Sequence, residues 1–505
     1  MSTTSIWSNR SEETSFPTLT NDITVDVAII GGGITGITAA SILAKAGKRV
    51  AVLEAWQVAK GTTGSSTGNL YAPVGERLHT VETKFNQEVL EKVAASRSAA
   101  IDFIQKQVQD YQLDCDFERV PWFFFTEPGE NDLNVEEERK AVKRAGLPIS
   151  EEVPANFPFT TDSFFYVPNQ AQFNPLRYTQ LLAKKIESPT CQIYENTKAV
   201  EFNNGSPCTV RTENGHTVTA NQIIMATHTP KGIYGVHTTM GPYREYAIAA
   251  RLKEPYPNPG IYWNMRMMQH LSIRTYTDQT GTYLLMLGEK HKVGQKEHNE
   301  ENYQKLIEYI RTRFSVDSIA FTWSAQNYKP SDSLPFIGPD GKNSNIYIAT
   351  GFSADGLTYG TLAAMIIADQ IQGIDNPWGK IYDANRFTPV ASALKFAKEN
   401  INVAYELAKD YLTGGDADKF NEIKPGEGAT VGVGTGQVAA YRDEQNNLHV
   451  VSAVCPHMGC IVHFNNTEKS WDCPCHGSRF SIDGEVLEGP AIAGLAPKKT
   501  NTEKG

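Results

Sequence analysis

Apolar residues near the start of the chain follow the pattern of a strand, a helix and a second strand. Residues 25–30 are a short β-branched run, which is typical of a strand buried in a parallel sheet. A helical stretch to Ala46 follows, Gly47 ends it, and residues 49–53 form a second apolar run that closes on Glu54. This order predicts a β-α-β unit and an α/β fold class.

The pattern changes twice toward the end of the chain. Between residues 391 and 411, apolar residues recur at three- and four-residue steps, which predicts a helix that ends at the glycines of residues 413–416. Residues 422–495 alternate short β-like runs with glycine-rich turns, as a small β-sandwich requires. We therefore predict an all-β C-terminal domain, joined to the rest by a helix and a hinge over residues 391–420.

The loop after the first predicted strand reads Gly-Gly-Gly-Ile-Thr-Gly. Gly31 permits the tight turn, Gly33 lets the backbone approach a pyrophosphate, and Gly36 allows the helix and the strand to pack closely. An acid about 20 residues further on, Glu54, can accept hydrogen bonds from an adenosine ribose. Since the motif follows a strand and opens a helix, it predicts a dinucleotide-binding fold for either FAD or NAD.

Residues 455–478 carry a metal-binding pattern. Cys455 and Cys473 can hold one iron as thiolates, and His457 and His476 can hold a second iron as neutral imidazoles. These C-x-H and C-x-x-H segments are the ligand set of a [2Fe-2S] cluster with mixed ligands. A zinc site uses the same residue types, and four of the seven cysteines fall within 21 residues, as in a disulfide knot.

The two halves of this stretch, C-P-H-M-G-C and C-P-C-H-G-S, resemble the ligand loops of a Rieske [2Fe-2S] domain. They look like the disulfide-containing kind found in cytochrome bc-type complexes. The resemblance implies a disulfide between Cys460 and Cys475 that clips the two loops together. It favours the cluster over a zinc site or a disulfide knot.

One position departs from the Rieske pattern. Two residues beyond Ser478, where respiratory relatives carry a tyrosine hydroxyl bonded to a cysteine ligand, this chain has Phe480. Hydrogen bonds to sulfur stabilise the reduced, more negative cluster. We therefore expect a reduction potential below that of respiratory Rieske centres.

Five further segments resemble, in their order, the flavin amine oxidoreductases typified by D-amino acid, glycine and sarcosine oxidases. These segments are residues 61–68, 172–178, 223–227, 332–338 and 349–358. The resemblance implies FAD in a Rossmann-like domain of the glutathione-reductase type, with an interleaved α+β substrate domain. The residues it implies as FAD contacts are Gly31, Gly33, Gly36, Glu54, Gly61, Thr62, Ser65, Ser66, Thr67, Val200, Thr227, Gly351, Asp355, Gly356, Leu357 and Thr358.

The last of these segments runs into a predicted helix from Tyr359 to Gln372. The N-terminal amides of that helix and the positive end of its dipole can face the pyrimidine ring of the flavin. We expect this helix to stabilise the reduced flavin anion.

The segments divide the chain into four parts. In order, they are a polar tail (1–24), an FAD-dependent oxidoreductase (25–390), the connecting helix and hinge (391–420) and the Rieske domain (421–505). Within the oxidoreductase, the flavin pieces are about 25–70, 171–230 and 325–390, and the substrate pieces are about 71–170 and 231–324.

Three residues in the substrate pieces are candidates for substrate contact or catalysis. Tyr71 ends the tail of the flavin loop, Arg244 lies within a Tyr-Arg-Glu-Tyr segment, and Arg274 lies further along the second substrate piece. An arginine can clamp a carboxylate through two parallel hydrogen bonds. Each arginine can also be a surface or structural residue, so both interpretations stay open here.

Two departures limit what the flavin resemblance implies. The basic residues that sarcosine-type enzymes place after the small-residue loop are not evident from Thr67 to Tyr71. No cysteine occurs between Cys208 and Cys455, so the cysteinyl-flavin bond of that subgroup has no candidate. We expect noncovalent FAD, and the identity of the substrate does not carry over.

Charge and composition exclude some partners. The 505 residues carry a net charge of −10 with a pI near 5.7, which argues against a nucleic-acid or anionic-membrane partner. Residues 1–21 lack the apolar core of a secretory signal, and no run of about 18 apolar residues predicts a transmembrane helix. Cys115, Cys191 and Cys208 are scattered and expected to be free, which agrees with a cytoplasmic location.

Together, the flavin and the cluster predict an electron path within one chain. A flavin takes two electrons as a hydride, whereas the cluster accepts one. We expect a dehydrogenase that oxidises a small amine or amino acid at the C–H bond beside nitrogen. It would pass electrons singly through the cluster to an external acceptor, such as a ferredoxin, a cytochrome or a quinone-linked protein. The combination is similar to the Bacillus-type Rieske iron-sulfur oxidoreductases.

Two other functions stay open. A Rieske oxygenase needs a mononuclear iron held by two histidines and a carboxylate, and His291 and His298 are the closely spaced pair outside the cluster segment. A redox carrier or sensor would keep both cofactors without substrate turnover, and the missing basic residues near Tyr71 motivate that hypothesis. Bound iron in excess of two per chain would favour the first, and a flavin that no amine reduces would favour the second.

Overall fold

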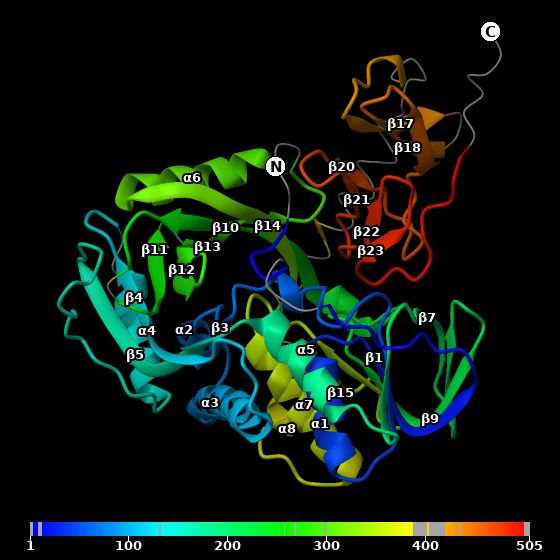
Figure 1. The fold of residues 1–505 in the computed structure, drawn as a ribbon, viewed down its shortest axis with the longest axis horizontal. Helices are drawn as coiled ribbons and strands as arrows, with labels where there is room; N and C mark the ends of the chain where they lie inside the picture. Colours follow the sequence, from blue (N-terminus) through cyan, green and yellow to red (C-terminus); the bar gives the residue numbers. More distant parts are fainter. Residues whose placement is uncertain are drawn as a thin grey trace.

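In a computed structural model of the chain, a large body and a small body lie side by side (Figure 1). The large body contains the elements up to residue 386, and the small body, drawn in orange and red, contains those from residue 420 onward. The structure describes residues 4–8, 13–130, 133–256, 258–266, 269–296, 299–386, 401–402, 420–433 and 436–498. The predicted helix over residues 391–411 falls outside these residues, apart from positions 401 and 402.

The first sheet of the large body carries the glycine-rich loop. In spatial order its strands are β15 (Phe336–Pro339), β16 (Ile346–Thr350), β9 (Thr217–Met225), β1 (Ile23–Ile30), β2 (Val50–Leu53) and β6 (Cys191–Tyr194), with β8 (Cys208–Thr212) and β7 (Ala199–Asn203) beside β9. β1 pairs in parallel with β2 and β9, so it is central and its last four residues are buried. This explains why the first strand is an uninterrupted apolar run.

Helices cover this sheet and contact one another. They are α1 (Ile34–Lys45), α3 (Gln87–Tyr111), α5 (Pro175–Ile186), α7 (Gly356–Gln372) and α8 (Gly379–Tyr382). α1 lies between α5 and α7 and is apolar on most sides because nearly all of it is buried. Asn174 caps α5 by accepting a hydrogen bond from the N–H of Arg177 at 3.0 Å.

The second sheet of the large body is mostly antiparallel. In spatial order its strands are β14 (Val316–Pro330), β10 (Met240–Leu252), β13 (Gly281–Lys292), β12 (Gln269–Asp278), β11 (Ile261–Arg266), β4 (Glu118–Thr126), β5 (Ser163–Gln172) and β3 (Asn69–Leu70). α6 (Glu300–Arg313) covers one face, where it packs with Tyr246 and Ile248 of β10. Ala247 and Ala249 point to the opposite face, into the core shared with the first sheet.

Two shorter helices, α2 (Leu78–Lys84) and α4 (Leu133–Arg144), pack on each other beside α3. None of the helices in the described parts of the chain has the length and apolar character needed to cross a lipid bilayer.

The small body consists of two antiparallel sheets. One contains β17 (Gly428–Val433), β18 (Gly436–Arg442) and β19 (Leu448–Ser452), and the other contains β20 (His463–Asn465), β21 (Ser470–Asp472), β22 (Arg479–Ser481) and β23 (Val486–Glu488). Trp471 and Phe480 are fully buried in its core. The predicted fold class, an α/β Rossmann-like part with an interleaved substrate sheet and an all-β C-terminal part, is confirmed.

Candidate functional site

Two loops of the small body bring its cysteines and histidines together. One loop, between β19 and β20, carries Cys455, and the other, between β21 and β22, carries Cys473. In each loop the N–H of this cysteine donates to the carbonyl five residues on, at 2.8 Å. The N–H of the glycine four residues on, Gly459 or Gly477, donates back to the cysteine carbonyl at 3.0 or 3.1 Å. Both loops therefore form the same turn, and the sequence repeats it as Cys-Pro-x-x-Gly.

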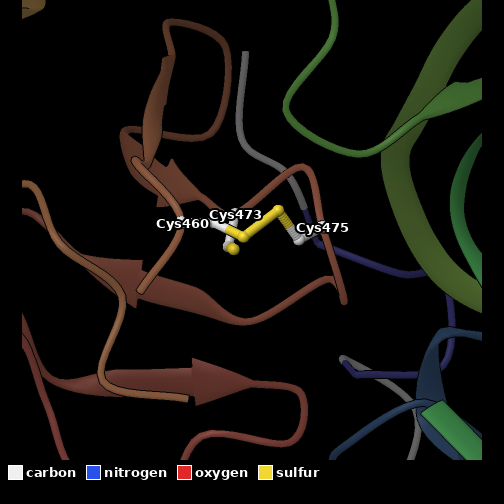
Figure 2. A group of neighbouring side chains, drawn as sticks. All are labelled: Cys460, Cys473 and Cys475. Carbon is white, nitrogen blue, oxygen red and sulfur yellow. A yellow bond between two sulfur atoms is a disulfide. The ribbon is translucent and has the colours of Figure 1, made fainter. Parts of the chain in front are cut away.

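A disulfide joins the two loops. It links Cys460 to Cys475, whose Cα atoms lie 6.5 Å apart (Figure 2). The sulfur of Cys473 belongs to the same group, in which the three sulfurs lie within 4.8 Å of one another. Because two of these sulfurs are bonded to each other, Cys473 is the member of the group that offers a thiol to a metal.

The remaining polar groups of the two loops fit a [2Fe-2S] cluster. The thiols of Cys455 and Cys473 are buried, and the hydrogen bond between them lowers the pKa of Cys455. The rings of His457 and His476 lie with their centres 5.0 Å apart. Nδ1 of His476 is buried without a hydrogen-bond partner, which is costly unless another group binds it. Two thiolates and two imidazoles are the mixed ligand set that the sequence predicts.

The loop after β1 is shaped for a close backbone approach. Gly31 has a φ of +107°, and a Cβ atom there would lie 2.5 Å from the carbonyl oxygen of Ala226. A Cβ atom on Gly36 would lie 1.9 Å from the carbonyl oxygen of Gly31. Only glycine fits at either position. The absence of side chains lets the start of α1 pack closely on the ends of β1 and β9, where a pyrophosphate can bind the N-terminus of the helix.

Glu54 lies at the end of β2, beside this loop. Its carboxylate accepts hydrogen bonds from the N–H of Gly32 at 2.7 Å and of Trp56 at 3.0 Å. Each carboxylate oxygen has a second lone pair, so Glu54 can also accept hydrogen bonds from ribose hydroxyls. Burial raises the pKa of this carboxyl group.

The second flavin loop includes the short 3-10 turn η1 (Thr63–Ser65) and is held through its carbonyl groups. Four side chains donate to four successive carbonyl oxygens of the loop. The pairs are Ser5 to Gly64, Trp323 to Ser65, Trp7 to Ser66 and Arg274 to Thr67. The protein itself therefore fixes this backbone, as in a largely preformed cofactor site.

Arg274 is engaged in this support. Its guanidinium donates to the carbonyl oxygens of Thr67 at 2.8 Å, Phe173 at 3.1 Å and Thr275 at 3.2 Å. The side chain is 1% exposed, and burial lowers its pKa to about 10. The hydrogen bonds of Nε and Nη1 therefore favour the structural interpretation of Arg274 over a clamp on a substrate carboxylate.

Tyr71 connects the flavin loop to the start of α7. Its hydroxyl donates to Asp355 at 2.6 Å, and the same carboxylate accepts from the N–H of Gly75 at 2.8 Å and pairs with Arg97 at 3.3 Å. α7 begins at Gly356, three residues earlier than predicted, so the first helical turn contains the predicted contacts Gly356, Leu357 and Thr358. Tyr71 was predicted as a catalytic candidate, and the structure shows its hydroxyl bound to Asp355.

Most of the other predicted FAD contacts lie in loops at the carboxyl ends of parallel strands. Residues 61–62 follow β2, Thr227 follows β9 and Gly351 follows β16. Carboxyl ends of parallel strands meet at one edge of a sheet, where doubly wound folds bind their ligands. Oγ1 of Thr62 lies 3.3 Å from Nδ1 of His228, which connects two of these loops. Val200 differs, since it lies in β7, two strands beyond β9.

Comparison with known proteins identifies both bodies. The family model described as FAD dependent oxidoreductase matches residues 26–370. The chain belongs to this family. The model of the Rieske [2Fe-2S] domain matches residues 416–498. The protein is therefore an FAD-dependent oxidoreductase whose Rieske domain carries one [2Fe-2S] cluster.

Named relatives support this assignment. The Rieske 2Fe-2S iron-sulfur protein YhfW of Bacillus subtilis is 34% identical over 497 residues, which cover 97% of this chain and 96% of that protein. Gamma-glutamylputrescine oxidoreductase of Escherichia coli is 24% identical over 75% of this chain and 88% of its own. The crystal structure of glycine oxidase from Geobacillus kaustophilus matches with a TM-score of 0.59 at 16% identity, covering 72% of this chain and 99% of that one. This last likeness shows the fold alone.

The oxidoreductase part contains a charged group that the sequence analysis missed. Glu245 follows the alternation of β10 and shares the face of Ala247, toward the flavin sheet. Nζ of Lys329 donates to Glu76 at 2.8 Å. Lys290 lies near Glu245 and Lys329, and its pKa is lowered by burial and by the charge of Lys329. Charged residues within otherwise apolar strands were the signal that could have revealed this group, since a buried charge needs a partner or a function.

Aromatic side chains lie beside these charges. The ring of His270 stacks on Trp263 at 4.2 Å, and Tyr71 lies 5.0 Å from the same Trp263 ring. Burial lowers the pKa of His270 to about 3, so this imidazole is neutral. Nε1 of Trp263 is buried without a hydrogen-bond partner. Aromatic faces, both signs of charge and an unsatisfied donor therefore converge on the flavin side of the second sheet, as expected of a binding site for a small polar molecule.

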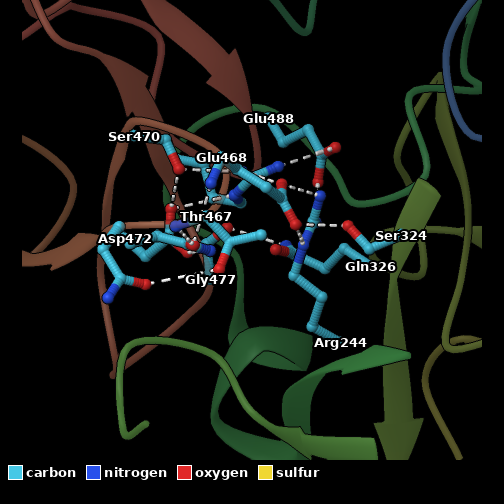
Figure 3. Close-up of polar contacts among 12 residues, drawn as sticks. Arg244, Ser324, Gln326, Thr467, Glu468, Ser470, Asp472, Gly477 and Glu488 are labelled. Atoms are coloured by element: carbon cyan, nitrogen blue, oxygen red, sulfur yellow. Dashed lines mark hydrogen bonds and ion pairs between the residues drawn. The ribbon is translucent and has the colours of Figure 1, made fainter. Parts of the chain in front are cut away.

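Arg244 lies on the opposite face of β10. Its Nε donates to Glu468 of the Rieske domain at 2.7 Å, Nη2 donates to the second oxygen of the same carboxylate, and Nη1 lies 3.6 Å from Glu488 (Figure 3). The prediction that Arg244 binds a substrate carboxylate is therefore corrected. Successive side chains of β10 point to opposite faces, so the side chain of Arg244 points away from the flavin sheet. The carboxylates that it binds come from the Rieske domain.

The histidine edge of the cluster site lies against the oxidoreductase. Nε2 of His457 is 3.2 Å from the carbonyl oxygen of Gly232, a distance at which a protonated ring nitrogen donates a hydrogen bond. His237, in the turn η2 (Gly235–Thr239), has its ring 5.0 Å from His457 and 6.3 Å from His476. The N–H of Gly232 also donates a hydrogen bond to the carbonyl oxygen of Pro490, in the Rieske domain, at 2.9 Å. No local sequence pattern predicts this contact, because the residues lie more than 200 positions apart.

Proposed function

We propose that the protein is a dehydrogenase of a small amine or amino acid that passes electrons one at a time through its Rieske cluster to an external acceptor. The observation that carries the proposal is the contact between the histidine edge of the cluster site and the oxidoreductase at Gly232 and His237. One named relative, gamma-glutamylputrescine oxidoreductase, supports a nitrogen-containing donor.

The bound cofactors supply the redox chemistry, with FAD taking a hydride and the cluster taking single electrons. The side chains on the flavin side of the second sheet supply binding and proton transfer. Glu245, on the face of β10 toward the flavin sheet, can pair with a substrate ammonium. Lys290 lies beside Glu245 and Lys329, and we propose it as the group that takes the proton an amine must lose before oxidation.

The ligand loop of Cys455 has a second face that suits an external acceptor. Val454 and Met458 are 37% and 48% exposed, and Pro456 between them is also exposed. They alternate with the buried ligands Cys455 and His457, so the cluster lies directly beneath an apolar surface. A one-electron acceptor protein, such as a ferredoxin, a cytochrome or a quinone-linked protein, can approach the cluster there.

The alternative functions have less support. His291, predicted as one ligand of an oxygenase iron, stacks on Tyr246 at 5.6 Å on the face that α6 covers, and His298 lies outside the described residues. The redox sensor hypothesis depended on missing basic residues, and Lys290 and Lys329 supply basic groups on the flavin side of the sheet. A cytoplasmic location remains a proposal that depends on Cys115, Cys191 and Cys208, which are buried free thiols.

The test is anaerobic addition of a panel of amines and amino acids to the purified protein. We expect at least one compound to bleach the flavin absorbance, and catalytic turnover to depend on an added one-electron acceptor. A flavin that no member of the panel reduces, although dithionite reduces it, would contradict the proposal and favour a carrier or a sensor.

A further inference from the structure

Arg244 belongs to a buried network of charges between the two bodies. Arg244 comes from β10, whereas Arg479, at the start of β22, comes from the Rieske domain. Both guanidiniums donate to Glu468, with Nε of Arg244 at 2.7 Å and Nη2 of Arg479 at 2.5 Å. The side chains of Arg244, Glu468 and Arg479 are 4%, 8% and 5% exposed. The flavin body thus supplies one of the two cations that neutralise a buried carboxylate of the Rieske domain.

Further side chains complete the network. Glu488 of β23 lies 3.6 Å from Arg244 and 3.3 Å from Arg479, so it bridges the same two guanidiniums. Ser324 of β14 donates a hydrogen bond to Glu468 (Figure 3). The two arginines lower the pKa of Glu468 to about 2, so the carboxylate is ionised at neutral pH. A paired buried charge of this kind is stable only while its partners stay in place.

The network continues to the second ligand loop. Asp472 and Arg479 lie opposite each other in the β21–β22 ladder, immediately outside the loop that runs from Cys473 to Ser478. Nε of Arg479 donates to Asp472 at 2.9 Å. Nε2 of Gln326, on β14 of the flavin body, donates to the carbonyl oxygen of Gly477 at 2.7 Å. The flavin body therefore contacts this loop directly at Gly477 and is linked to its base through Glu468 and Arg479.

We propose that Arg244 is a positioning residue that docks the Rieske domain on the oxidoreductase with the histidine edge of the cluster turned toward Gly232 and His237. The proposal rests on the proposed function, because it concerns the step from flavin to cluster. In that step, reduced FAD loses one electron, one ferric iron of the cluster becomes ferrous, and flavin protons pass to solvent. A second electron follows once an acceptor has oxidised the cluster again. Buried charge pairs specify one docked arrangement, and rates of electron transfer depend steeply on such geometry.

The test uses Arg244→Gln in the full-length holoprotein and reduces the flavin photochemically, without any amine. Glutamine keeps hydrogen-bonding capacity but removes the charge and the forked geometry. The matched control is Arg251→Gln, which changes an exposed arginine on the same strand. We expect Arg244→Gln to slow the flavin-to-cluster transfer by at least about tenfold, with FAD content, cluster content and the cluster potential unchanged. We expect Arg251→Gln to leave the rate unchanged.

Two further variants keep the test decisive. If Arg244→Gln loses a cofactor, Ser324→Ala, which removes one hydrogen bond to Glu468, takes its place with a smaller expected loss of rate. Arg244→Lys should fall between the parent and Arg244→Gln, since lysine keeps the charge but not the two parallel hydrogen bonds. An unchanged rate in Arg244→Gln or its substitute, or an equal loss in Arg251→Gln, would overturn the proposal. Because no amine is used, a failure of the proposed amine oxidation leaves this result interpretable.

Discussion

Close contacts of single residues decide where the FAD site forms. The clearest case is Gly36, whose missing side chain lets α1 approach the carbonyl of Gly31. The sequence motif predicted a close backbone approach at this position, because a short local pattern specifies the turn. By contrast, the roles of Arg244 and Arg274 depend on partners far along the chain, so their residue type alone could not define them.

Gly36→Ala should abolish FAD binding. The new Cβ would lie 1.9 Å from a backbone oxygen, and neither β1 nor α1 can move without opening the sheet. The measurement is the FAD content of the purified variant. Gly341→Ala is the control, since the nearest atom to a Cβ at this turn glycine is 4.0 Å away. Normal FAD content in Gly36→Ala would show that the loop geometry is different.

Phe480→Tyr should raise the reduction potential of the cluster. Phe480 is fully buried in the core that also contains Cys455 and Cys473, so a hydroxyl there has no access to water. A hydrogen bond to a ligand sulfur stabilises the reduced cluster, and a bond of roughly 1 kcal/mol corresponds to about 40 mV. A redox titration followed by electron paramagnetic resonance (EPR) measures the shift. An unchanged or lower potential would contradict this account of the departure at Phe480.

At the scale of elements, local sequence patterns predicted individual strands and helices, but they did not predict which strands pair. The strand at β1, the helix α1 and the short strands of the C-terminal domain follow from periodicity and glycine spacing. The eight-stranded second sheet joins strands from β3 to β14, so its order depends on long-range contacts. The face of each residue follows from its place in that sheet, which explains why Glu245 was missed while its neighbour Arg244 was selected.

The packing of α4 on α2 gives a pH dependence of stability. Glu138 of α4 accepts hydrogen bonds from the N–H of Leu78 and of His79 in α2, each at 2.9 Å. Burial raises its pKa from 4.5 to about 7. The unfolded chain binds fewer protons between these values, so the contribution of Glu138 to the free energy of unfolding falls as pH rises through this window, by about 3 kcal/mol.

The measurement compares thermal midpoints of the wild type and Glu138→Gln at about pH 5 and about pH 8. Glutamine stays neutral, so we expect the wild type to lose stability relative to this variant as pH rises. Glu152→Gln changes an exposed glutamate that follows α4 and serves as the control. If the stability of the wild type relative to Glu138→Gln stays constant or increases with pH, the predicted direction of the pH dependence is wrong.

At the scale of the whole molecule, the position of the Rieske domain carries the functional argument. Its ligand residues were predicted from the sequence, because the C-x-H and C-x-x-H patterns each lie within one short segment. The surface against which they lie was not predicted, since Arg244 and Glu468 are 224 residues apart and carry no shared local pattern. In the structure, the cluster histidines lie at the oxidoreductase surface. This position supports the proposed electron path between the two domains.

The most direct test of this path is to mix the protein anaerobically with a substrate that bleaches the flavin, freeze the mixture at successive times and record flavin absorbance and cluster EPR on the same samples. We predict that a reduced Rieske signal grows as the flavin signal changes, before any external reductant is added. A flavin that bleaches fully while the cluster stays oxidised until dithionite is added would contradict the internal path.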